Sequence, residues 1–254
     1  MPAFLYDYCR IENHSPVQVG GGIMLPTDRQ TQAHLLCCDC EDLLNKGGEK
    51  WISGKLATWE RSFPFYDCLT SVRPLFDEDG MAVYLGAQNS KIGVKQLTHF
   101  ALGIFWKASV HSWKKDSRDP QIDLGPYSDE IRKWLSKAGQ FPTHLHLTVV
   151  VEKPETAQIT INSPYEGIRK YSWRSYFFHV PGILFMMSLG KTVDENTRAI
   201  AITSAGNPIN ISQRLTNSFQ SLMVETVRNS RKTRALLQAK AKVDARIARA
   251  ATKP

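Results

Sequence analysis

The sequence lacks a long hydrophobic run. Its longest apolar stretch, Phe100 to Trp106, ends at Lys107 and is far shorter than the ~20 apolar residues that a membrane-spanning helix needs. The first residues also lack the basic and apolar regions of a signal peptide. We therefore expect a cytoplasmic protein with no membrane partner.

Cysteine is scarce, since the 254 residues include five cysteines, four of which precede residue 41. In a reducing compartment cysteines rarely form structural disulfides. The thiols are therefore interpreted as metal ligands or as buried side chains. Cys68, which stands among aromatic residues, is predicted to belong to the core.

Net charge is nearly absent outside the C-terminal end. The formal charge is +8, yet residues 1–227 contain equal numbers of basic and acidic residues. Residues 228–254 contain nine Lys or Arg against one acid, Asp244. Such a tail neutralises nucleic-acid phosphates in a salt-dependent and sequence-independent way. The residues assigned to this contact are Arg228, Arg231, Lys232, Arg234, Lys240, Lys242, Arg246 and Arg249.

Other interpretations of the tail stay open. A solvated basic helix without any partner has the same composition, and an Ala-rich helix also suits docking on a partner protein. Binding to a membrane surface is disfavoured because no Trp or Phe follows Phe219, and interfacial helices normally insert such residues.

The composition is globular, with 42% hydrophobic and 22% charged residues. Alternating apolar residues around glycines predict a β-hairpin over about 17–25. A helix is expected over 40–51, where Gly47 and Gly48 should end or bend it. A second hairpin turns at Asp79 and Gly80 and leads to an apolar helix at about 95–113.

In the second half of the chain the spacing of the apolar residues changes from that of helices to that of strands. A helix with Ser128 as its N-cap is closed by Gly139, and the following β-branched and aromatic runs predict an antiparallel sheet of four or five strands. His144 and His146 share a strand face, so they could share a metal or simply lie on a half-exposed edge. Asn210 and Gln213 form a capping box before a long C-terminal helix.

Cys37 and Cys40 have a spacing that lets two thiolates face one cation at the start of a helix. A tetrahedral zinc site needs two further ligands. The upstream candidates are Cys9, Glu12, His14 and His34. Cys9 and His14 are preferred because thiolate and imidazole are the ordinary zinc ligands, and the order of Cys9, hairpin and Cys37-bearing helix is that of a treble-clef finger. The alternative is that Cys37 and Cys40 are buried reduced thiols.

The stretch "HLLCCDCEDLLNKGGEKWI" resembles the second knuckle and helix of the HNH-like treble-clef proteins of bacteria and their phages. The resemblance covers about residues 9–52 and implies a ββα-metal core with structural zinc on Cys37 and Cys40. In active members a histidine near the end of the first hairpin strand is the general base, and nucleic-acid phosphate is the substrate. This chain has Gly22 or Ile23 where that base would stand.

The predicted fold is α+β, in four segments. They are a treble-clef finger (1–55), a helical and hairpin middle (56–140), a β-rich part ending in a helix (141–227) and a basic tail helix (228–254). The predicted function is that of a nucleic-acid-associated prokaryotic or phage protein whose zinc is structural and whose catalytic base is missing. The alternatives are an HNH-like endonuclease that uses magnesium or manganese, and a protein–protein adaptor or subunit of a larger complex.

Overall fold

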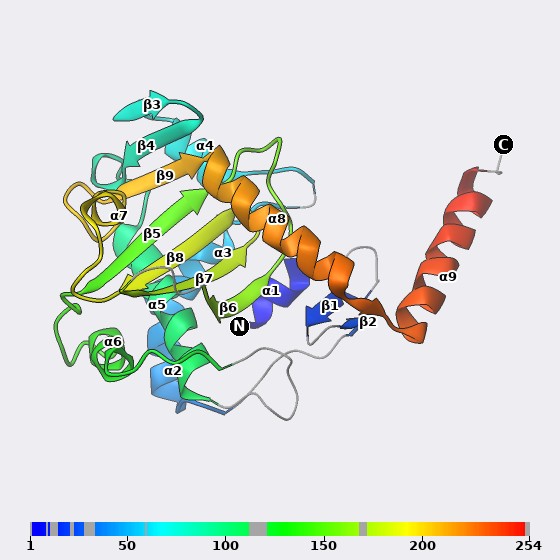
Figure 1. The fold of residues 1–254 in the computed structure, drawn as a ribbon, viewed down its shortest axis with the longest axis horizontal. Helices are drawn as coiled ribbons and strands as arrows, with labels where there is room; N and C mark the ends of the chain where they lie inside the picture. The colour runs from blue at the N-terminus through cyan, green and yellow to red at the C-terminus, as the bar shows by residue number, and fades with distance from the viewer. Residues whose placement is uncertain are drawn as a thin grey trace.

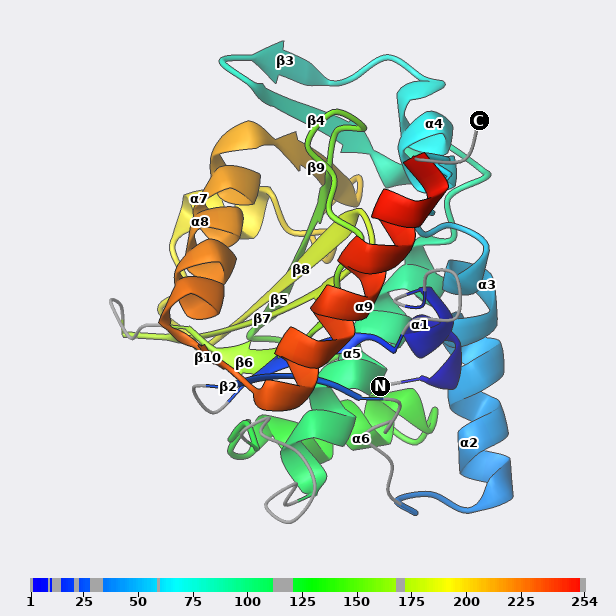
Figure 2. The same ribbon diagram turned by 90° about the vertical axis from the view of Figure 1, so that its right-hand side faces the viewer.

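The computed structural model describes residues 2–8, 10, 15–20, 23–27, 34–58, 60–111, 121–167 and 172–251. The fold is mixed α+β, built on one large twisted sheet (Figure 1). Viewed along the sheet, helix α8 (Gln213–Asn229) covers one face and helix α5 (Val94–Val110) the other (Figure 2). None of the described helices is long and apolar enough to span a bilayer.

The large sheet has seven strands. Neighbouring strands are antiparallel except for the parallel pair β5 and β9. In spatial order the strands are β3 (Phe76–Glu78), β4 (Met81–Leu85), β9 (Pro208–Ser212), β5 (Leu145–Val151), β8 (Ile183–Leu189), β7 (Arg174–Val180) and β6 (Asn162–Glu166). The predicted hairpin at Asp79 and Gly80 is confirmed, and β9 joins it to the strands of the second half.

The remaining elements surround this sheet. A small second sheet contains β1 (Val17–Gly20), β2 (Ile23–Pro26) and β10 (Arg231–Lys232), so the predicted N-terminal hairpin is confirmed. The other helices are α1 (Ala3–Tyr8), α2 (Cys38–Leu44), the π-helical η1 (Asn45–Glu49), α3 (Lys50–Ser53), α4 (Pro64–Thr70), the 3₁₀ turn η2 (Gly86–Gln88), α6 (Tyr127–Leu135), α7 (Glu195–Ala199) and α9 (Arg234–Ala251).

Aromatic side chains fill the space between α5 and the sheet. Phe178 of β7 lies at the centre, with ring centroids 4.9 Å from Phe105 and 4.6 Å from Phe185. All three rings are fully buried. Because strands β5, β8 and β9 are covered on both faces, their buried residues run almost without interruption instead of alternating.

Gly47 and Gly48 do not end the helix that the sequence predicts over 40–51. Gly47 and Gly48 lie in the π-helical segment η1, and the helical run continues from Cys38 to Ser53. A Cβ on Gly48 would lie 2.4 Å from the Gln96 carbonyl oxygen and 2.6 Å from the Phe100 amide nitrogen. The glycines are therefore required by the close approach of this run to α5.

Three local predictions were wrong. Ser128 lies inside α6, whose N-cap is Pro126. Asn210 lies in β9, where its amide donates to the carbonyl oxygens of Val149 and Ile200, and the cap of α8 is Ser212 instead. The long C-terminal helix is interrupted, because β10 separates α8 from α9.

Candidate functional site

Cys37 and Cys40 lie at the start of the helical run, with Cys37 as the N-cap of α2. Both thiols are exposed, as is Cys38 between them, so the alternative of buried thiols is wrong. Hydrogen bonds from the Cys40 backbone N–H and then its thiol lower the pKa of Cys37, and the same contact raises the pKa of Cys40. The contact between the two cysteines thus favours the thiolate form of Cys37 over that of Cys40, and the thiolate is the form that binds metal. Cys68, predicted as core, is half-buried against the main core.

The other two predicted ligands, Cys9 and His14, lie outside the described residues. Within the described ranges no three His, Cys, Asp or Glu side chains are grouped as a metal site would require, and this includes His144 and His146. The Tyr8 hydroxyl donates to the Ser53 carbonyl oxygen at 2.5 Å. Ser53 ends the run that Cys37 begins, and a run of this length spans roughly 20 Å. The described structure thus brings together Cys37 and Cys40 alone.

The basic tail forms an arm, here defined as the C-terminal end of α8 from Arg228 together with β10 and α9. In Figure 1 helix α9 stands away from the large sheet, at the end of the molecule to which α8 leads. The described basic side chains of the arm are all exposed and have no ion-pair partner among the described residues; they are Arg228, Arg231, Lys232, Arg234, Lys240 and Lys242. Arg246 and Arg249 belong to α9, but their side chains lie outside the described part.

The arm is joined to the N-terminal hairpin. Strand β10 pairs in parallel with β2, placing Arg231 beside Ile23 and Lys232 beside Met24. The Thr233 amide also donates to the Met24 carbonyl oxygen at 3.0 Å. The hairpin of the predicted finger therefore holds the start of the basic helix, a proximity that sequence analysis did not predict.

A buried pair of ionisable residues, His179 and Glu152, was also missed. Their side chains are 0% and 1% exposed, and His179 Nε2 lies 3.3 Å from Glu152 Oε2, an ion-pair distance without hydrogen-bond geometry. The Gln158 N–H donates to the same Oε2 at 2.8 Å, and His179 Nδ1 lies 3.1 Å from the Thr160 carbonyl oxygen. The ring of Phe219 on α8 stacks on His179 at 5.0 Å, sealing the pair from solvent.

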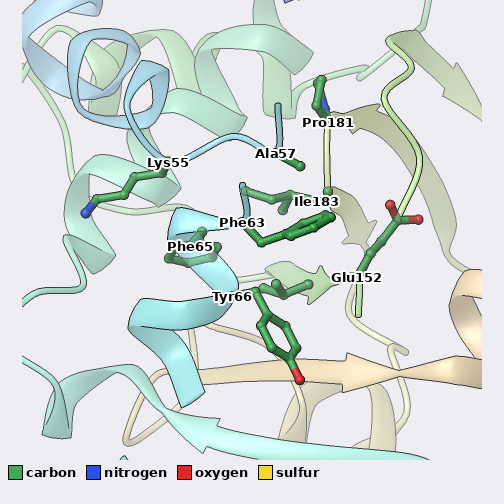
Figure 3. Close-up of a pocket in the computed structure, with 10 residues that line it drawn as sticks. Lys55, Ala57, Phe63, Phe65, Tyr66, Glu152, Pro181 and Ile183 are labelled. Atoms are coloured by element: carbon green, nitrogen blue, oxygen red, sulfur yellow. The ribbon is translucent and has the colours of Figure 1, made fainter. Parts of the chain in front are cut away.

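A small pocket lies beside this pair, with an empty volume of about 180 Å³. Its polar lining side chains include Glu152, Tyr66 and Lys55. In Figure 3 the Glu152 carboxylate and the Tyr66 hydroxyl point in opposite directions, and Lys55 extends away from both. Since no polar groups converge on a common point, this pocket lacks the arrangement of a catalytic site.

Comparison of the chain with protein-family models, with curated proteins and with solved structures gives no match. The class that the structure defines is a mixed α+β protein with a mostly antiparallel seven-stranded sheet, an exposed cysteine pair and a basic helical arm.

Proposed function

We propose that this chain is a nucleic-acid-associated protein that contacts the phosphate backbone through its arm. The observation that carries the proposal is the row of exposed cations on β10 and α9, which have no ion-pair partner in the part of the chain that the structure describes. A cation already paired with a carboxylate gains little from a phosphate, whereas these side chains are free to replace the counterions of a nucleic acid. The neutral body contributes little to the field, so the arm concentrates the positive potential.

Neutralising two cations of α9 tests this proposal in the full-length chain. Binding of a short fluorescent duplex should weaken steeply with salt, and Lys240→Gln/Lys242→Gln should reduce the slope of log affinity against log salt by about 2. Lys91→Gln/Lys95→Gln removes two exposed lysines of the body and should leave the slope unchanged. Equal slopes for the two double variants, or no binding at about 50 mM salt, would refute the role of the arm.

We propose further that Cys37 and Cys40 hold a structural zinc ion, with His14 as a third ligand. Cys9 is not retained as a ligand, because its neighbour Tyr8 binds Ser53 at the opposite end of the helical run from Cys37. Two features support the zinc site: the exposed thiol pair at the start of α2, in which the pKa of Cys37 is lowered by hydrogen bonds from Cys40, and the order of hairpin β1–β2 before the cysteine-bearing helix. Zinc bound there would fix the start of α2 relative to the N-terminal segment.

Metal analysis of purified protein should therefore find about one zinc per chain. Cys37→Ser and Cys40→Ser should each lose the metal and lower the melting temperature, since structural zinc stabilises the folded state. Cys38→Ser is the matched control, because this neighbouring thiol is not among the proposed ligands. Zinc well below one per chain, or an equal effect of the three substitutions, would remove the metal from the proposal.

A further inference from the structure

The β3–β4 hairpin forms one free edge of the large sheet and exposes a mixed apolar and acidic surface. Strand β3 pairs with β4 on one side and with no described strand on the other. Leu75 is 69% exposed and Phe76 is 44% exposed. They are followed by three exposed acids, Asp77, Glu78 and Asp79. We call these five residues the acidic hairpin.

Negative charge accumulates around the acidic hairpin. Burial raises the pKa of Tyr66, and the carboxylates of Glu155, Asp67 and Asp77 raise it further, so these three charges act on the same side of the molecule. Asp77 and Glu78 have no ion-pair partner within the described residues, and Arg73 is the nearest cation along the chain. The hairpin therefore presents uncompensated acids beside two exposed apolar side chains.

The arm has the complementary character. It carries the exposed cations named above, for which the described ranges contain no ion-pair partner, and Leu237 on α9 is 52% exposed. Along the longest axis of the molecule α9 and β3 lie at opposite ends (Figure 1), so the arm does not contact the acidic hairpin of its own chain. Any contact between these two surfaces has to form between different molecules.

We propose that the arm of one copy docks on the acidic hairpin of a second copy of this chain. The charges are opposite in sign, and exposed apolar side chains stand beside the charges on both surfaces: Leu237 on the arm, and Leu75 and Phe76 on the hairpin. Because every copy carries both surfaces at opposite ends, the contact is heterologous, and it closes into a pair or ring if the geometry permits. The arm then serves two ligands, and a nucleic acid competes with the second copy for the same cations.

Sedimentation velocity on the full-length chain, with charges exchanged between the two surfaces, tests this inference. At about 50 mM salt the mass should rise with concentration above the 28.7 kDa of one chain, and higher salt should reverse the increase because exposed charges are screened. Asp77→Lys/Glu78→Lys and Lys240→Glu/Lys242→Glu should each weaken self-association by roughly a hundredfold, since each places like charges together. An equimolar mixture of the two variants should associate again, because each supplies the partner that the other has lost.

Glu130→Gln/Glu195→Gln, two exposed acids elsewhere, is the control and should associate like the unchanged chain. A monomer at all concentrations, or a mixture of variants that fails to associate, would overturn the proposal. The outcome is separable from that of the nucleic-acid proposal, because Asp77→Lys/Glu78→Lys retains the arm and should still bind duplex. Loss of duplex binding with intact self-association would refute only the nucleic-acid role.

Discussion

Replacing Glu152 with alanine is expected to lower the free energy of unfolding by about 3–5 kcal/mol. The substitution leaves the fully buried ring of His179 without its carboxylate and the Gln158 N–H without its acceptor. Buried polar groups that lose their partners pay the cost of their desolvation, and both side chains of this pair are almost fully buried. Urea denaturation at neutral pH measures the effect.

Glu155→Ala is the matched control. Glu155 lies three positions further on but is exposed, so its removal should change stability by no more than about 0.5 kcal/mol. The double variant Glu152→Leu/His179→Phe replaces both partners by apolar groups and should recover a large part of the loss. If Glu152→Ala unfolds at the same urea concentration as Glu155→Ala, the pair does not stabilise the fold.

The second large effect is expected from Gly48→Ala. The added methyl group would lie 2.4 Å from the Gln96 carbonyl oxygen and 2.6 Å from the Phe100 amide nitrogen, so the helical run and α5 would have to move apart. Backbone atoms inside a helix cannot rotate away as a side chain can. We expect a loss of about 3 kcal/mol, the upper end of the usual cost of overpacking.

Gly54→Ala provides the comparison at the end of the same helical run. Apart from its chain neighbours and the backbone of that run, no heavy atom of the described residues lies within 4 Å of a Cβ at Gly54, which follows the last residue of the run, and its φ of −88° suits any residue. Alanine there should be neutral or stabilise by up to about 1 kcal/mol, because it restricts the unfolded chain. Thermal unfolding of the two variants measures the difference, and similar melting temperatures would contradict the close packing inferred for Gly48.

Local signals in the sequence predicted local structure well. Glycine and aspartate turns between apolar runs identified both the β1–β2 and the β3–β4 hairpins, since such turns need no distant partner. The parallel pairing of β5 with β9 was not predictable, because it joins strands far apart in the chain and leaves no pattern in either. The sequence predicts that Gly47 and Gly48 end or bend their helix, whereas their role depends on α5, which approaches them in space and cannot be read from the local sequence.

In the candidate site, too, local features could be predicted from the sequence and contacts between distant segments could not. The cysteine pair at the start of a helix and the clustered cations of the tail follow from spacing and composition, whereas the exposure of the cysteines does not. The contact between the arm and the β1–β2 hairpin could not be predicted from the sequence, because the two-residue strand β10 that forms it carries no periodicity. Glu152 ends an apolar run and His179 interrupts another, a signal that could have marked both as buried polar residues, although the runs alone cannot show which residue pairs with which.

The pairing of β10 with β2 has a consequence for the dynamics of the molecule. It ties together the two ends of the chain through a strand of two residues, whereas β5 and β8 share seven residue pairs inside the core. Segments held by few backbone contacts open at low free-energy cost while the core stays folded. We therefore expect the start of the basic helix to separate from the β1–β2 hairpin at a lower free-energy cost than the strands of the large sheet separate from one another.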